Sequence, residues 1–266
     1  HKRGTEQYRI LSRKKVNAIE WLTESGTIAK AFPVYRTPEQ LVFEQYLLSD
    51  GEDFADLSER FNKKGLPGNK SPFENSGIMY KNRFWTLRTK PRFEGEYQIL
   101  SDVLLTPGKV PDEYFLSTTS MTQNKGWKYL KGAKKEKRHG RDGFIYSYNE
   151  GGMIFPDALD RPSRTIITGE GGSSPSRFKH VVKFKPTKGQ RKRLKLDSKE
   201  HNKIREDLRL LKSEWVRRLT PIELERLNMF PDNHTEGASD SKRAFFMGNA
   251  LVIGIIEKFA EVLAER

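Results

Sequence analysis

The 266-residue sequence contains no cysteine. This absence excludes disulfides, thiolate metal sites and any cysteine nucleophile within these residues. The histidines lack the paired spacing of a zinc motif, so we expect no metal site; they are His1, His139, His180, His201 and His234. No apolar run approaches the roughly 20 residues that span a bilayer, and no signal-peptide pattern is present. We therefore expect a cytoplasmic protein without a membrane partner.

Acidic residues are outnumbered: 35 Asp and Glu stand against 49 Lys and Arg, a formal net charge of +14. Such an excess favours a polyanionic partner, because neutralising phosphates gives affinity that does not depend on sequence. Nucleic acid is the favoured partner, and an anionic membrane surface is the alternative. With 35% hydrophobic residues and 16 Phe, the chain can bury the core of one large domain or two modest ones.

The first half of the chain changes pattern near residue 63. Residues 17–22 favour a short helical turn, and residues 37–62 favour one or two helices, with Thr37 as cap, Pro38 at the first helical position and a break at Gly51. Short aromatic and β-branched runs between Gly, Pro and Asn then predict strands. These runs are residues 83–88, 95–100, 143–148, 153–156, 164–168 and 180–184.

Two helices are predicted in the last third. Residues 196–219 show capping-box spacing at Asp197 and Glu200, and apolar residues fall on one helical face, namely Ile204, Leu208, Leu211 and Trp215. The second helix begins at Thr220, with Pro221 at its first position and Glu223 as the reciprocal cap. It should end before Phe230, which precedes a proline.

Three segments carry the candidate DNA contacts. Residues 131–141 hold six Lys or Arg and one Glu beside Trp127 and Tyr129, a composition suited to a loop on a phosphate backbone; a solvated surface loop is the alternative. Residues 188–196 add five cations, or simply lead into the next helix. Residues 162–184 place Gly and Ser between two strand-like runs rich in cations, as an ordinary hairpin loop also could. The predicted DNA-binding residues are Lys134, Lys135, Lys137, Arg138, Arg141, Arg164, Thr165, Arg177, Lys179 and His180.

Two blocks near the end of the chain have a family pattern. The first block is "RRLTPIELERLNMFPD" (217–232), and the second is "RAFFMGNALVIGIIEKF" (243–259). The first resembles motif IX of the DNA (cytosine-5) methyltransferases, which reads R-x-L-T-x-x-E-x-x-R-L-x-G-F-P-D. The second resembles motif X of the same family, which contains G-N-[AS]-[VL]. "RPSRTIITGEGG", from residue 161, resembles the stretch that ends the family's target recognition domain. Met229 departs from the pattern, where the family usually has Gly. The matching residues are Arg217, Leu219, Thr220, Glu223, Arg226, Leu227, Phe230, Pro231, Asp232, Gly248, Asn249, Ala250 and Leu251.

The resemblance implies an α+β fold: a mainly β target recognition domain, and C-terminal helices that pack onto a Rossmann-like catalytic domain supplied by another chain. The expected parts are an N-terminal segment (1–62), the recognition domain (63–187), a basic segment with a charged amphipathic helix (188–219) and the motif IX and X helices (220–266). In the family, the motif X Asn lines the S-adenosylmethionine pocket. The resemblance therefore assigns cofactor contacts to Gly248, Asn249 and Ala250.

For the motif IX and X residues, the residue types alone also suggest structural roles. Gly248 would allow a tight turn and a close backbone approach, and Asn249 could equally cap the helix that follows. Family motif IX mainly organises the recognition domain, which implies that Arg217, Arg218 and Arg226 are structural ion-pair partners rather than DNA readers.

The family's catalytic blocks are missing, including the Pro-Cys nucleophile block. Cytosine C5 accepts a methyl group only after a thiolate adds at C6 while N3 is protonated, and this chain has no thiolate. We therefore expect it to be inactive alone, as the recognition subunit of a split, restriction–modification type methyltransferase acting in the prokaryotic nucleoid, with a shared cofactor, double-stranded DNA as substrate and a Pro-Cys partner chain. A fragment of a cleaved or truncated enzyme is the other explanation. A non-catalytic DNA-binding or regulatory protein remains open, whereas an RNA-binding protein would show an aromatic signature that is not found.

The motif X helix supports a partner chain. Its apolar residues surround its circumference: Leu251, Val252, Ile255, Ile256, Phe259, Val262 and Leu263. Burial within this chain's own core is the alternative.

Overall fold

The computed structural model describes residues 18–35, 43–48, 51, 53, 55–56, 73–80, 82–140 and 143–265. These residues form a mixed α/β structure in two compact units. Unit 1 comprises His1–Gly95 and Ile255–Arg266, and unit 2 comprises Glu96–Gly254. Among the described helices, none combines the length and the apolar character that a bilayer crossing requires.

Unit 1 contains small sheets and short helices. Strands β2 (Phe43–Leu47), β4 (Arg83–Leu87) and β3 (Ser76–Tyr80) form an antiparallel sheet in that order, and β1 (Val34–Tyr35) pairs with β5 (Lys90–Pro91). Helix α2 (Ala18–Glu20) runs into a π-helical turn, Trp21–Ser25, and α3 (Thr27–Ala31) follows. The last helix of the chain, α11 (Ile253–Ala264), reaches this unit, where Phe259 meets Phe32 edge-on at 5.3 Å.

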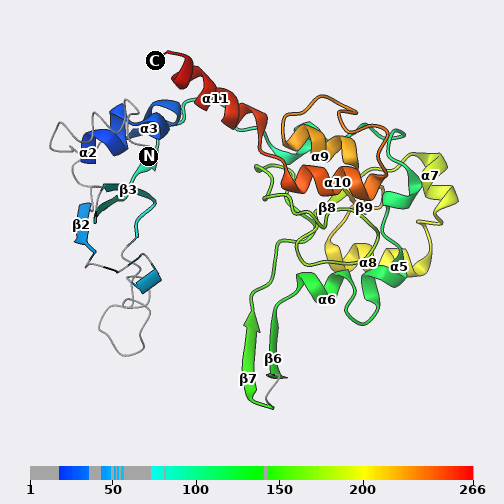
Figure 1. The fold of residues 1–266 in the computed structure, drawn as a ribbon. Helices are drawn as coiled ribbons and strands as arrows, with labels where there is room; N and C mark the ends of the chain where they lie inside the picture. Colours follow the sequence, from blue (N-terminus) through cyan, green and yellow to red (C-terminus); the bar gives the residue numbers. More distant parts are fainter. Residues whose placement is uncertain are drawn as a thin grey trace. The chain divides into compact units, whose positions relative to one another are not determined.

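Unit 2 is built around a central ribbon of two antiparallel strands, β8 (Val181–Phe184) and β9 (Trp215–Arg218). Figure 1 shows α9 (Pro221–Leu227) and α10 (Asp240–Asn249) on one side of this ribbon, and α5 (Thr118–Thr122), α6 (Trp127–Lys131) and α8 (Lys199–Leu208) on the other. Neighbouring residues of β8 pack on opposite sides of the ribbon. Val181 belongs to a hydrophobic cluster with Trp127 and Trp215. Val182 belongs to a second cluster with Leu224 and Met247. The ribbon thus joins two cores.

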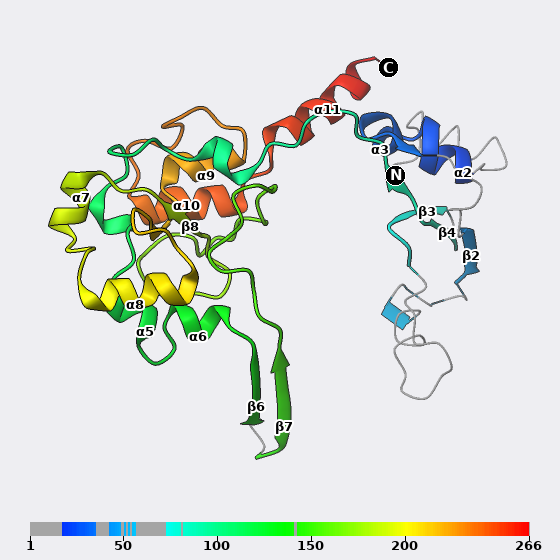
Figure 2. The same ribbon diagram turned by 180° about the vertical axis from the view of Figure 1, so that it is seen from behind.

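The remaining elements of unit 2 lie at its edges. They are the 3-10 turns η3 (Leu100–Val103) and η4 (Asp112–Tyr114), the helix α7 (Lys188–Arg193), and a hairpin of β6 (Lys134–His139) and β7 (Ile145–Glu150). The same elements can be followed from behind in Figure 2, where the hairpin again projects from the body of the unit below α6 and α8.

The structure corrects the helix predicted over residues 196–219. Helix α8 is capped by Ser198, whose hydroxyl accepts from the backbone of His201, and it ends at Arg209, which adopts a left-handed conformation with φ of 53°. Trp215 is instead a strand residue, fully buried, with its indole N–H donating to the carbonyl of Leu116 at 2.7 Å. The apolar spacing that continues the helical period therefore belongs to a strand paired with β8.

Some of the other predicted helices and strands are confirmed, and some are wrong. The helical turn at 17–22 and the strands at 83–88, 143–148 and 180–184 are confirmed within a residue or two. The strands predicted at 95–100, 153–156 and 164–168 are wrong, because those residues form loops or, from Leu100, a 3-10 turn. The prediction of helix over 37–62 is wrong at Phe43–Leu47, which is a strand held by pairing with β4, and most of its other residues lie outside the described chain.

The basic run at 131–141 is also not the loop that its composition suggested. Most of it is strand β6, although Lys and Glu disfavour strands, because β6 pairs along its whole length with β7.

Candidate functional site

The segment that resembles motif IX is organised by a buried ion pair. Arg217 donates to both carboxylate oxygens of Glu223, at 2.6 and 2.8 Å, and neither side chain is exposed to solvent. Glu223 also accepts the backbone N–H groups of Leu105 and Thr220, at 2.7 and 2.8 Å. A single carboxylate thus caps α9 and joins it to β9 and to the segment that follows η3. The ion pair gives Arg217 the structural role expected of it.

Glu225, one turn into α9, organises the loop that leads to α10. It accepts the backbone N–H groups of Asn233 and Thr235, at 2.8 and 3.0 Å, and the guanidinium of Arg243 at 2.9 Å. Burial opposes its ionisation, but the hydrogen bonds from Thr235 and Arg243 outweigh this effect and hold its pKa below the ordinary value. The carboxylate therefore stays charged and fixes the approach to α10.

Arg226 points the other way and pairs with Asp232 at 2.6 Å, which lowers the pKa of that carboxyl group. It also donates to the carbonyl of Val103 at 3.1 Å. Like Arg217, it has the structural role expected of it.

The expected cofactor residues end one helix instead of beginning the next. Gly248 and Asn249 are the last two residues of α10, and Ala250 is its C-cap. Gly248 does allow a close approach, but to the chain itself: a Cβ there would lie 2.3 Å from the backbone N of Thr168. The tight turn expected at Gly248 is therefore wrong, and so is the capping of the following helix by Asn249.

Asn249 nevertheless has an amide free to bind a ligand. Its side chain is exposed, and Nδ2 donates to the carbonyl of Phe245 at 3.0 Å, which fixes the orientation of the amide. Within the described chain, Oδ1 of Asn249 accepts no hydrogen bond. This oxygen is accessible to a ligand, whereas residues 167–168 leave no room for a ligand against Gly248.

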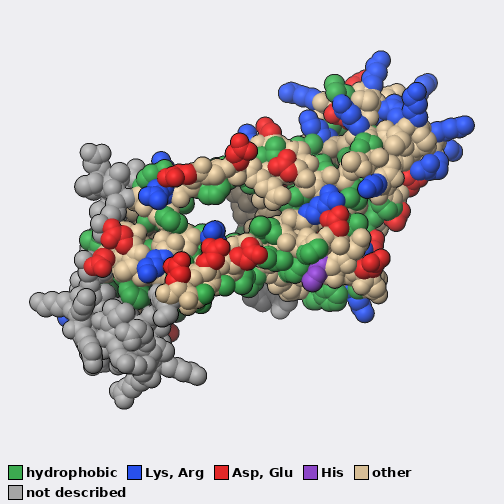
Figure 3. Space-filling model, turned by 90° about the horizontal axis from the view of Figure 1, so that it is seen from above, with side chains coloured by type: hydrophobic (Ala, Val, Ile, Leu, Met, Phe, Trp, Pro, Cys, Tyr) green, Lys and Arg blue, Asp and Glu red, His purple; other side chains and the backbone are tan. Residues whose placement is uncertain are grey.

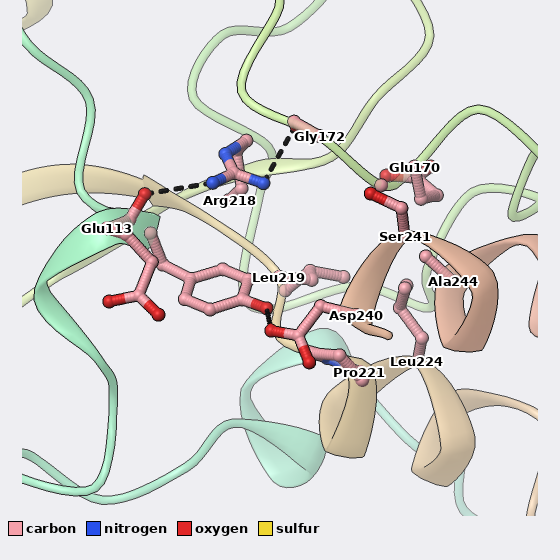
Figure 4. A pocket seen from close by; sticks show the side chains of 12 residues that line it. Glu113, Glu170, Gly172, Arg218, Leu219, Pro221, Leu224, Asp240, Ser241 and Ala244 are labelled. Carbon is pink, nitrogen blue, oxygen red and sulfur yellow. Dashed lines mark hydrogen bonds between the residues drawn. The ribbon is translucent and has the colours of Figure 1, made fainter. Parts of the chain in front are cut away.

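A small cavity lies close to these helices, between η4, β9, α9 and α10 (Figure 4). Arg218 lies over the ring of Tyr114 at 4.9 Å and donates to the carbonyls of Gly172 and Glu113, at 2.8 and 2.9 Å. Tyr114 donates a short hydrogen bond to Asp240; burial first, and then this bond, raise the pKa of the phenol. The cavity measures about 130 Å³, below the roughly 300–1,000 Å³ of ligand pockets. Arg218 therefore ties elements together here, as expected of a structural arginine.

The candidate DNA contacts of residues 162–184 are mostly satisfied within the chain. Arg164 pairs with Asp157 at 2.7 Å, and Arg177 pairs with Glu150 at 2.9 Å. Lys179 is buried and donates to the carbonyls of Gly172 and Ser174. These contacts give the three cations structural roles.

His180 is likewise enclosed, with no exposed surface. Glu170 accepts from its backbone N–H at 2.9 Å and meets Nδ1 at 2.8 Å, and Ser163 meets Nε2 at 3.1 Å. Thr165 remains exposed, so it is the predicted contact of this segment best placed to touch DNA.

The predicted DNA-binding residues on β6 lie on two different faces of the strand, because successive side chains point to opposite sides. Lys135 and Lys137 are exposed, whereas Lys134 and Arg138 are half-buried and engaged by acidic or aromatic neighbours. Arg141 lies outside the described residues.

Two partners of these cations, Tyr148 and Glu150, were missed at the sequence level, whereas Tyr129 was noted beside the basic run. Tyr129, Tyr148 and Glu150 contact the half-buried face of β6. For Tyr148 and Glu150, the alternation of side chains along residues 145–150 was the available signal.

Another group of cations lies on α7. Lys188 and Lys192 are exposed, Arg193 pairs with Asp112 at 2.7 Å, and Arg191 pairs with Asp197. Figure 3 shows Lys and Arg side chains gathered at the end of unit 2 where Figure 1 places α7. The segment 188–196 is thus mainly helical, and part of its charge is neutralised.

Comparison with known proteins places these features in a family. The profile of the C-5 cytosine-specific DNA methylases matches residues 39–265, which is most of the chain. The chain belongs to this family. Its members methylate DNA with S-adenosylmethionine as the methyl donor.

A relative and a solved structure add detail. The Type II methyltransferase M.Sau3AI of Staphylococcus aureus is 33% identical over 234 residues, which cover 88% of this chain and 46% of that protein. The chain thus spans about half the length of this curated relative. The structure of the Entamoeba histolytica methyltransferase EhMeth matches 85% of this chain and 54% of its own, at 14% identity and a TM-score of 0.35, a likeness too weak to carry an argument.

Proposed function

We propose that this chain is the DNA-recognition part of a restriction–modification type DNA (cytosine-5) methyltransferase and that another polypeptide supplies the nucleophile. One combination of observations carries the proposal: the family match extends over residues 39–265, yet the chain contains no cysteine. Because C5 methylation depends on a thiolate that adds to the base, the reacting sulfur must come from outside these residues.

The division of labour follows from what the chain does contain. The recognition domain would lie within residues 63–187, followed by the basic segment and amphipathic helix of 188–219, and the part from 220 onward would dock on the catalytic domain. The chain would choose the DNA sequence, while the cysteine-bearing half extrudes the target base and methylates it.

Exposed apolar residues on the last helix support a docking role. Ile255 and Ile256 are each 44% exposed and Leu263 is 56% exposed, while Val262 is the buried residue of α11. Apolar side chains clustered on an exposed face mark interaction surfaces. The cysteine-bearing half would cover them.

In the bound state S-adenosylmethionine would supply the methyl group. Asn249 is the residue of this chain best placed to hold it, through the exposed amide that Phe245 orients. Gly248 contributes indirectly, because it lets α10 lie against residues 167–168 and so fixes the position of Asn249.

Reconstitution tests the proposal. The chain is mixed with the cysteine-bearing half encoded beside it, and methylation of plasmid DNA is mapped by bisulfite sequencing. We expect methylation at a defined sequence in the mixture and none with either component alone, and no methylation when the partner's cysteine is replaced by serine. Equal, equally specific activity of the partner by itself would refute the proposal, and specific DNA binding without methylation in any mixture would indicate a regulatory DNA-binding protein.

The same assay tests Asn249. Asn249→Ala should raise the KM for S-adenosylmethionine while the affinity for DNA stays the same. Asn124→Ala, at another exposed asparagine of unit 2, is the matched control. An unchanged KM in Asn249→Ala would remove this residue from the cofactor site.

A further inference from the structure

The hairpin formed by β6 and β7 is a two-stranded ribbon that projects from unit 2 (Figures 1 and 2). Its six described residue pairs run from Lys134 opposite Glu150 to His139 opposite Ile145. Since successive side chains of a strand point to opposite faces, the ribbon has two faces with different chemistry.

The first face is self-contained. Lys134 donates to Glu150 at 2.7 Å and lies 4.9 Å from the ring centre of Tyr129. The Tyr129 hydroxyl donates to Glu136 at 2.6 Å. Arg138 stacks on the ring of Tyr148 at 3.5 Å. Each cation of this face has an acidic or aromatic partner, so the face stiffens the ribbon.

The second face is unlike the first. Lys135 stands opposite Asn149, and Lys137 stands opposite Ser147. All four side chains are exposed, and the face contains no carboxylate among the described residues of the hairpin. It therefore presents two free cations beside an amide and a hydroxyl, which can both donate and accept hydrogen bonds.

One arginine fixes the base of the hairpin. Arg177 donates to the carbonyls of Leu130 and Gly132, at 3.1 and 3.4 Å, on the side that enters β6. It also donates to the carbonyl of Gly151 at 2.6 Å and pairs with Glu150 at 2.9 Å, on the side that leaves β7. Both strands are therefore held by the same guanidinium, which sets the direction in which the ribbon projects.

We propose that this hairpin enters the major groove of DNA with its second face. In this arrangement Asn149 and Ser147 contact base edges, and Lys135 and Lys137 contact phosphates. Arg177 is a positioning residue, because it holds the base of the hairpin. The inference rests on the proposed function and deepens it by naming the reading element.

Two physical arguments favour the major groove. It admits a two-stranded β-ribbon, and an amide that donates and accepts together matches adenine N6 and N7. Alternate residues of a strand lie about 6.8 Å apart, roughly two 3.4 Å steps of a DNA strand, so Lys135 and Lys137 can reach phosphates two steps apart. An acidic protein surface could attract the same lysines, but it would not require the exposed amide of Asn149 opposite Lys135.

The test selects binding sites from a random-sequence duplex library with the full chain, and measures the affinity of the selected duplex and of an unrelated duplex. Asn149→Ala and Ser147→Ala should lower discrimination between the two by roughly 5- to 150-fold, with little change in binding to the unrelated duplex. Lys135→Gln with Lys137→Gln should weaken both duplexes alike. The matched control, Lys188→Gln with Lys192→Gln on α7, removes the same charge elsewhere.

Groove and positioning are tested separately. Replacing purines of the selected site by 7-deazapurines removes a major-groove acceptor; it should weaken the wild-type chain at one position and not weaken Asn149→Ala there. Arg177→Lys keeps the positive charge but loses the planar guanidinium that binds both strands. Discrimination between the selected and the unrelated duplex should therefore fall, while the affinity for the unrelated duplex is kept. Circular dichroism melting checks that each variant is folded.

The outcomes separate the two proposals. If the wild-type chain selects no sequence, the proposed function and this inference both fail. If it selects a sequence and the hairpin variants discriminate as well as the wild type, only the inference fails. Unchanged selection with weaker binding of the cysteine-bearing half would make this face a protein interface, and would also overturn the inference.

Discussion

At the residue scale, Gly248 shows how a family residue can be explained by packing alone. Two effects oppose one another in Gly248→Ala. Alanine favours a helix over glycine by about 1 kcal/mol, whereas a Cβ at 2.3 Å from the backbone of Thr168 forces α10 and that loop apart. Overpacking costs about 1–3 kcal/mol and more where the obstacle is backbone. We expect net destabilisation in urea unfolding.

Gly151→Ala is the control for this prediction. An added Cβ there meets nothing within 4 Å, so its free energy of unfolding should stay within about 0.5 kcal/mol of the wild type. A stabilised Gly248→Ala would show that residues 167–168 do not press on α10.

Lys131 is a residue whose charge the fold disfavours. It is 1% exposed, and burial lowers the pKa of its amine from 10.5 to about 8. Below pH 8 the amine is protonated in both the folded and the unfolded chain; between 8 and 10.5 the unfolded chain binds more protons. The free energy of unfolding should therefore rise with pH across this window, by at most about 3 kcal/mol from this group.

The measurement is a difference between wild type and Lys131→Met in chemical unfolding at pH 7 and pH 10. We expect the difference to move in favour of the wild type at the higher pH. Lys128→Met, at an exposed residue of the same helix, is the matched control. A difference that is constant with pH would mean that the folded and unfolded chains have the same amine pKa, and would contradict the lowering by burial.

At the scale of single elements, α9 depends on one carboxylate that serves as helix cap and ion-pair partner together. Glu223→Gln keeps the shape of the side chain but leaves the Arg217 charge buried without its counterion. Breaking a buried pair in this way costs about 3–5 kcal/mol. We expect that loss in urea unfolding, against about 0.5 kcal/mol or less for Glu236→Gln on the exposed loop. Equal stability of the two variants would contradict the role assigned to Glu223.

Which elements could be predicted depended on whether their cause is local. Helix α9 was predictable because Thr220, Pro221 and Glu223 lie within one turn and cap it without outside help. Strand β9 was not, because Trp215 continues the apolar spacing of α8 and becomes a strand only through pairing with β8. The same holds for β6, whose charges are tolerated because β7 and Tyr129 compensate them.

The residues of the candidate site were also predictable only where their role does not depend on residues distant in sequence. Resemblance indicated Asn249, which is exposed in the structure. Composition could not tell exposed Lys135 and Lys137 from buried Lys179, because burial is decided by residues distant in sequence. Counting cations therefore could not show that Arg164, Arg177 and Lys179 have partners within the chain.

At the scale of the whole molecule, the formal charge of +14 predicts binding that weakens steeply with salt. Each phosphate neutralised by a side chain contributes about 0.9 to the slope of log K against log salt concentration. Because Arg164, Arg177 and Lys179 are satisfied internally, the slope should reflect the exposed lysines rather than the net charge.

Fluorescence anisotropy titrations at salt concentrations between about 50 and 200 mM measure this slope directly. Lys135→Gln with Lys137→Gln should lower it by about 1 to 2, because two phosphate contacts are lost. Arg164→Gln should reduce stability but leave the slope of the folded chain unchanged, since its guanidinium is committed to Asp157. If instead every lost cation lowered the slope equally, the general positive field and not the hairpin face would hold the DNA.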